Sequence, residues 1–139
     1  MTRAVLDTNV LVSALISPFG NEALVLLAVE QGRVAPCFSP AILEEYAGVL
    51  SRPKFNFAER EIDGLIELLR RAGLLFETRQ ATGTSPDPKD EAFIACAIAS
   101  GAEFLVTGNR RHFPAQSYGR AKVVSSRELI EFLSRLRSR

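Results

Sequence analysis

Three acidic side chains stand where carboxylates could act together in chemistry: Asp7, Glu45 and Asp90. Asp7 directly follows the short apolar run from Ala4 to Leu6, and an acid directly after a buried strand is a common functional position. An Asx turn that starts the next helix also accounts for Asp7. Three carboxylates that face one crevice repel one another, and a hard divalent cation with oxygen ligands is the simplest compensation.

Helical periodicity separates the functional candidates from surface acids. In the helix predicted for Ile42 to Leu50, Glu45 flanks the apolar stripe, whereas Glu44 lies nearly opposite it and faces solvent. In the helix opened by Asp87, Asp90 falls at the centre of the stripe and points toward the core, where it needs a cation, hydrogen-bond donors or an opening. A half-exposed surface acid also accounts for Glu45, and a capping box with Asp87 also accounts for Asp90.

Two further polar residues, His112 and Asn109, bear on which kind of site the acids could form. His112 is the sole histidine, which argues against a zinc site and against a Ser-His-Asp site, and we interpret it as a loop residue. Asn109 follows the strand predicted for Phe104 to Thr107. If that strand neighbours the first one, Asp7 and Asn109 face the same crevice.

The elements that must position these residues alternate between strands and helices. This pattern predicts a parallel sheet with helices on both faces, and such sheets bind ligands at the carboxyl ends of their strands. Ser39 with Pro40 predicts a helix start, Ser125 with Glu128 predicts a capping box, and Gly73 and Gly101 predict helix ends. The predicted strands are Ala4–Leu6, Val34–Phe38, Leu74–Phe76, Phe104–Thr107 and Lys122–Val124; the predicted helices are Val10–Ile16, Glu22–Val29, Ile42–Leu50, one built on Ile62, Leu65, Ile66 and Leu69, one from Asp87 to Ala99, and one after Ser125. A polar loop is predicted from Gln80 to Pro88.

The length and composition of the chain indicate its domain organisation and the broad class of protein. The chain has 139 residues, 47% of them hydrophobic and 24% charged, which predicts one globular domain over residues 1–139 and excludes a disordered or fibrous protein. No run reaches the roughly 18 apolar residues of a membrane span. A net charge of +1 gives no global attraction for a polyanion, which must be held locally. Cys37 and Cys96 are expected to be buried free thiols in the cytoplasm.

Three segments in order carry a family resemblance. AVLDTNVLVSAL, SPAILEEYAGVLSRPKF and DPKDEAFIACAIASGAEFLVTGNRRHF, between Ala4 and Phe113, resemble the PIN-domain nucleases, in particular the VapC-like toxins. The resemblance implies a three-layer α/β domain with a central parallel sheet flanked by helices. It also implies an acidic cluster that binds Mg²⁺ or Mn²⁺ and hydrolyses single-stranded RNA, with Asp7, Glu45 and Asp90 as its first, second and third acids.

The resemblance extends to neighbouring polar residues and has one departure. Asn9 and Thr107 match the polar residues that orient ligands or phosphate. Many relatives carry a fourth acid where this chain has Asn109, and this difference puts a full second metal site in doubt. Local cationic charge for RNA could come from the loop beyond it, which contains Arg110, Arg111 and His112, although a solvated basic turn is an equal reading.

The chemistry of a phosphodiester suggests roles for the acids. A cation must bridge a phosphate oxygen and lower the pKa of a bound water. Asp7 and Asp90 would be direct ligands, and Glu45 would bind through water or accept the proton of the attacking water. Three acids and one Asn fit one firm metal ion, with any second ion recruited by the substrate phosphate.

The resemblance also implies protein partners. Toxin relatives form homodimers and are silenced by an antitoxin protein, so the resemblance implies both partners, and the helix from Ala58 to Ala72 could serve either contact. No membrane partner is expected.

One alternative function is that of a catalytically silent binding protein with the same fold. A weaker one is a phosphatase with Asp7 as covalent nucleophile, but such enzymes need an acid where Asn9 stands and a cap for which this chain lacks length.

Overall fold

The computed structural model describes residues 1–78 and 87–137, which build a six-stranded sheet in the order β3-β2-β1-β4-β6-β5. Five of these strands are parallel, and β5 is antiparallel to β6. The strands are β1 (Thr2–Leu6), β2 (Val34–Phe38), β3 (Leu74–Leu75), β4 (Phe104–Val106), β5 (Ser117–Tyr118) and β6 (Ala121–Val124). The fold is therefore α/β with a central, mostly parallel sheet, as the sequence predicts.

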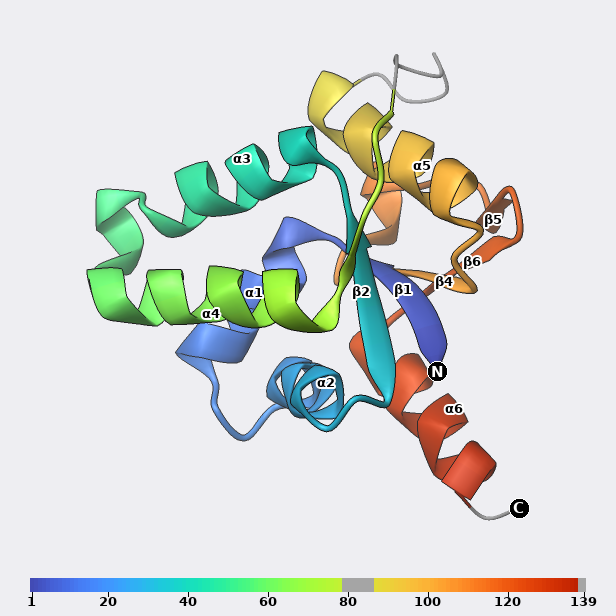
Figure 1. Ribbon diagram of the computed structural model, residues 1–139, viewed down its shortest axis with the longest axis horizontal. Helices are drawn as coiled ribbons and strands as arrows, with labels where there is room; N and C mark the ends of the chain where they lie inside the picture. Colours follow the sequence, from blue (N-terminus) through green and yellow to red (C-terminus); the bar gives the residue numbers. More distant parts are fainter. Residues whose placement is uncertain (79–86, 138–139) are drawn as a thin grey trace.

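Helices cover both faces of this sheet (Figure 1). Helix α5 packs on β1, β2 and β4, whereas α2 contacts β2 and α6 contacts β4 from the other side. Helices α3 and α4 lie side by side beyond β2 and contact each other. The helices are α1 (Thr8–Ile16), α2 (Asn21–Glu30), α3 (Pro40–Leu50), α4 (Glu59–Ala72), α5 (Pro88–Ser100) and α6 (Ser126–Arg137), with short 3-10 turns η1 (Pro53–Phe55) and η2 (Arg110–His112).

The predicted helix boundaries follow from local chemistry that the structure shows directly. The Ser39 hydroxyl accepts a hydrogen bond from the backbone N–H of Ile42 at 3.3 Å, which confirms the N-cap of α3. Ser125 and Glu128 form the predicted reciprocal capping box at 2.9 and 3.1 Å. Gly101 ends α5 with a φ of 63°, a conformation that glycine adopts without steric cost.

Several details of the prediction need correction. The strand predicted to reach Thr107 ends at Val106, and the one predicted for Leu74–Phe76 ends at Leu75. No sequence pattern indicates β5, because its two residues are too few to show an alternation of apolar and polar side chains. Of the loop predicted from Gln80 to Pro88, residues 80–86 lie outside the described part of the chain.

The core follows from the parallel arrangement, because a sheet covered on both faces buries its strands completely. All five residues of β2 are buried, and the last three residues of β1 are fully enclosed. The free thiols of Cys37 and Cys96 lie in this core. In the part of the chain that the structure describes, no single helix has the length and apolar character of a membrane span; α1 and α2 satisfy both criteria only as a pair bent by 103°.

Candidate active site

Strands β1 and β4 are neighbours, which is the condition under which the sequence placed Asp7 and Asn109 at one crevice, and this pairing brings Asp7 beside the end of β4. Leu6 pairs with Val106, and the backbone N–H of Asp7 donates to the Val106 carbonyl at 2.9 Å. The Asp7 side chain is only 6% exposed. Its carboxylate makes no capping bond to α1 and instead accepts a 2.7 Å hydrogen bond from the Thr107 hydroxyl. The Asx-turn interpretation of Asp7 is therefore wrong.

The turn after β4 is joined to the residues that follow β1 by a second contact. The side-chain oxygen of Asn9 accepts a hydrogen bond from the backbone N–H of Gly108 at 3.1 Å. The Thr107 hydroxyl oxygen also accepts from the backbone N–H of Asn109 at 3.0 Å. Asn9 and Thr107 thus fix the geometry of the crevice.

Asn109 and His112 continue this network around Asp7. The Asn109 side-chain oxygen caps η2 by accepting from the backbone N–H of Arg111 at 3.0 Å. Its amide nitrogen lies 3.3 Å from His112 Nε2, and His112 Nδ1 lies 3.4 Å from Asp7 Oδ2. His112 is therefore not a simple loop residue. The spacing of Asn109 and His112, three apart in a capped turn, was the only signal that could have shown this.

Asp90 approaches the same crevice from α5. It is 8% exposed. Burial raises the pKa of its carboxyl from 3.8 to about 6; the His112 charge opposes this rise, and the Asp87, Asp7 and Glu45 charges add to it. Across residues 1–78 and 87–137, no hydrogen bond to this carboxylate is found. The capping bond at the start of α5 comes from the Asp87 carboxylate, which accepts from the Lys89 N–H at 2.9 Å. The capping-box explanation of Asp90 is therefore wrong.

Glu45 enters from α3 and is half-buried, whereas Glu44 is exposed, as the helical pattern predicts. The neighbouring Tyr46 is buried, and its hydroxyl donates to the Leu6 carbonyl at 2.5 Å. This bond fastens α3 to the end of β1. The charge of Glu45 contributes to the raised pKa of Asp90, so Glu45 acts electrostatically on the same site.

The basic turn beyond Asn109 divides into two kinds of residue. The Arg110 guanidinium forms an ion pair with Glu128 and donates to the Val123 carbonyl at 3.3 Å, so it is directed toward α6. The Arg111 side chain is exposed and has no ion-pair partner in the described ranges. Of the two arginines, Arg111 is the one available to a substrate.

The carboxylate oxygens of Asp7, Glu45 and Asp90 suit a hard cation, but these three side chains do not yet form a complete metal site. Among the residues described, no three His, Cys, Asp or Glu side chains form a group that could already hold a metal ion. Two buried side-chain oxygens have no hydrogen-bond partner there: the hydroxyls of Thr8, which follows Asp7 in the chain, and of Ser126. The largely buried Asp90 carboxylate also accepts no hydrogen bond from the described residues. Oxygen donors of this kind suit Mg²⁺ or Mn²⁺, which keep several waters when bound.

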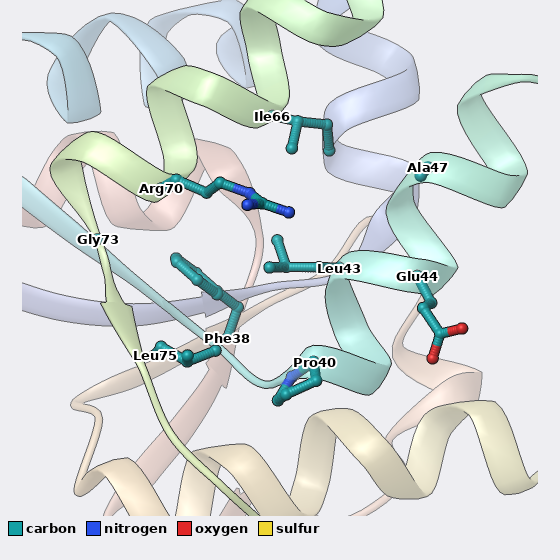
Figure 2. Close-up of a pocket in the computed structure, with 9 residues that line it drawn as sticks. All are labelled: Phe38, Pro40, Leu43, Glu44, Ala47, Ile66, Arg70, Gly73 and Leu75. Carbon is teal, nitrogen blue, oxygen red and sulfur yellow. The ribbon is translucent and has the colours of Figure 1, made fainter.

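A separate hollow of about 590 Å³ lies between α3 and α4. In Figure 2, Phe38, Leu43 and Ile66 surround it, the Arg70 side chain extends across it, and Glu44 points away. Asp7, Glu45 and Asp90 are not among its lining residues. This surface is therefore distinct from the acidic crevice.

The mostly parallel sheet thus has Asp7 at the carboxyl end of β1, with Glu45 on α3 and Asp90 on α5. The family model for the PIN domain matches residues 3–111, and the chain belongs to the PIN-domain family. Proteins of this family are generally nucleases, and they usually use divalent metal ions. No curated protein matches the chain.

Proposed function

We propose that this protein is a metal-dependent endoribonuclease that hydrolyses single-stranded RNA and serves as the toxin of a toxin–antitoxin pair. The observation that carries the proposal is the Asp90 carboxylate, which is buried and lacks a hydrogen bond from the described residues. Its pKa is raised mainly by this burial, and the charges of Asp87, Asp7 and Glu45 add to the rise. Such a group is unfavourable in an apoprotein. It is favourable in a protein that binds a cation there.

The chain's own residues divide the work of phosphodiester hydrolysis. Asp7 and Asp90 would hold Mg²⁺ or Mn²⁺, which when bound supplies charge for the phosphate and acidifies a water. Glu45, half-buried at the rim, would position that water or accept its proton. Thr107 keeps Asp7 oriented through its 2.7 Å hydrogen bond. Asn9 holds the turn after β4 against the start of α1.

Single-stranded RNA is the substrate that the toxin resemblance suggests. Arg111 is exposed in the turn next to Asn109, and its guanidinium is available to a substrate phosphate. We place the activity in the cytoplasm, where an RNA substrate is present and buried thiols such as Cys37 and Cys96 stay reduced.

A homodimer and an antitoxin are the protein partners we propose, and α4 offers a surface for the antitoxin. The hollow between α3 and α4 has an apolar floor formed by Phe38, Leu43 and Ile66. A second hollow continues along α4 past Glu59, Asp63 and Glu67. Arg70 lines both hollows, but the rim as a whole carries more acidic than basic side chains. This surface suits an amphipathic segment that carries basic residues.

A cleavage assay tests the proposed activity. Purified protein should cut single-stranded RNA in Mg²⁺ or Mn²⁺ and not in EDTA. Asp7→Asn and Asp90→Asn should abolish cleavage, and Glu45→Gln should reduce it strongly, whereas the exposed Glu44→Gln on the opposite side of α3 should match the wild type.

The same assay separates the competing explanations. RNA binding without cleavage in any metal would identify a silent binding protein. A trapped aspartyl-phosphate on Asp7 would identify a phosphatase. Equal activity of the Glu44 and Glu45 variants would contradict the assignment of Glu45.

A further inference from the structure

Both hydrogen-bond donors that reach the Asp7 carboxylate reach the same oxygen. The Thr107 hydroxyl lies 2.7 Å from Oδ2, and His112 Nδ1 lies 3.4 Å from it. Within residues 1–78 and 87–137, no donor reaches Oδ1. The two oxygens of Asp7 are therefore differentiated by the protein: one is held by side chains and the other is left for a ligand.

The position of the histidine proton follows from the neighbouring amide. Asn109 Oδ1 accepts from the backbone N–H of Arg111 at 3.0 Å, so the other end of the amide, Nδ2, must face His112 Nε2. An amide nitrogen only donates, so the neutral ring can only accept at Nε2. The ring proton therefore sits on Nδ1, which faces Asp7 Oδ2.

We infer that His112 is a positioning residue for Asp7. Asn109 fixes the ring in the Nδ1–H form, and the ring together with Thr107 holds Oδ2, so that Oδ1 alone is presented to the cation. As far as it concerns the cation, the inference rests on the proposed function; the tautomer and the orientation of Asp7 do not depend on it.

The same arrangement explains what Asn109 does where many relatives carry an acid. Its oxygen is used to cap η2 and its nitrogen to hold His112. In Asn109→Asp both side-chain oxygens only accept, so Nε2 would have to carry a proton and the pattern around Asp7 would change. Asn109 thus supports the first metal position and supplies no second one. We expect one Mn²⁺ per chain.

The tautomer can be tested without any metal. His112 is the sole histidine, so side-chain ¹⁵N NMR of the metal-free protein at pH 8.5 reports on this ring alone. We expect Nδ1 protonated and Nε2 unprotonated, with loss of this preference in Asn109→Ala. A ring protonated at Nε2 in the wild type would overturn the inference.

The positioning role is tested by Mn²⁺ titration calorimetry on three substitutions. The amide N–H of His112→Asn falls near the place of Nδ1 and can still reach Asp7, whereas that of His112→Gln falls near the place of Nε2 and cannot. We expect Ala and Gln to weaken Mn²⁺ binding by about 10-fold or more, and Asn to stay within about threefold of the wild type. Arg127→Ala on α6 is the control.

The other outcomes of these two experiments would overturn either the positioning role of His112 or the proposed function. Equal affinity of all three variants would overturn the positioning role, and so would equal loss in all three, because a direct nitrogen ligand cannot be replaced by Asn. His112 is 42% exposed, so these variants should fold, and melting temperatures check this. If the wild type shows the expected tautomer and binds no Mn²⁺, the proposed nuclease fails while the orientation of Asp7 stands.

Discussion

The hydroxyl of Tyr46 donates a 2.5 Å hydrogen bond to the carbonyl of Leu6, the residue directly before Asp7. Both residues are buried. The bond joins α3, which carries Glu45, to the end of β1, which carries Asp7 at its exit. One buried hydrogen bond therefore links the two elements that carry Asp7 and Glu45.

Tyr46→Phe should lower the free energy of unfolding by about 1 to 3 kcal/mol, because it leaves the Leu6 carbonyl in the core without its donor. The aromatic contact with Phe93, whose ring centroid lies 6.1 Å away, should persist. Urea denaturation measures the loss. Tyr118→Phe is the control, since its hydroxyl only accepts from the part-buried Ala115 N–H at 3.2 Å and should cost less. Equal losses would contradict a special role for the Tyr46 bond.

Metal-free stability should depend on pH through Asp90. Its pKa in the folded protein is raised to about 6 by burial, so the native state holds a proton that the unfolded chain releases. The contribution is complete below pH 4 and disappears as pH rises through about 6. Its size is at most about 3 kcal/mol. Asp90→Asn should flatten this part of the pH profile in EDTA. A profile equal to that of the wild type would mean that Asp90 is not the titrating group.

Mg²⁺ should stabilise the wild type more than it stabilises Asp90→Asn. The ion binds the folded cluster and not the dispersed chain, so at a hundredfold excess over its dissociation constant it adds about 2.7 kcal/mol. Thermal melts of both proteins in EDTA and in Mg²⁺ measure the gain. A variant that is destabilised in EDTA and retains the full Mg²⁺ response would remove Asp90 from the metal site.

Arg111 and Arg110 should differ in their effect on RNA binding. Arg111→Ala should flatten the salt dependence of binding by about 0.7 in log–log slope, the value of one single-strand phosphate contact. Arg110→Ala should leave this slope unchanged, because its guanidinium is paired with Glu128, and should cost less than about 1 kcal/mol of stability. Titrations at several salt concentrations compare the two. A change of slope for Arg110→Ala alone would reverse the assignment.

Much of the framework could be predicted because its signals are local. The N-cap at Ser39, the capping box of Ser125 and Glu128, and the helix end at Gly101 each depend on residues within a few positions of one another. The exposure of Glu44 and the burial of Asp90 follow from helical periodicity alone.

The contacts around Asp7 could not be predicted in the same way. His112 and Thr107 lie about a hundred positions further along the chain and reach Asp7 only because β1 and β4 pair. The ion pair of Arg110 with Glu128 likewise depends on where α6 begins. No periodicity or capping rule carries such information, since it arises from the order of strands in the sheet.

The place of β4 between β1 and β6 has a consequence for the order in which the protein becomes competent during synthesis. A nascent chain that has emerged only as far as α5 already contains Asp7, Glu45 and Asp90. It still lacks the strand that anchors the backbone of Asp7 and the turn that orients its carboxylate. The acids therefore leave the ribosome before the residues that align Asp7, and an incomplete chain does not yet hold the geometry of the site.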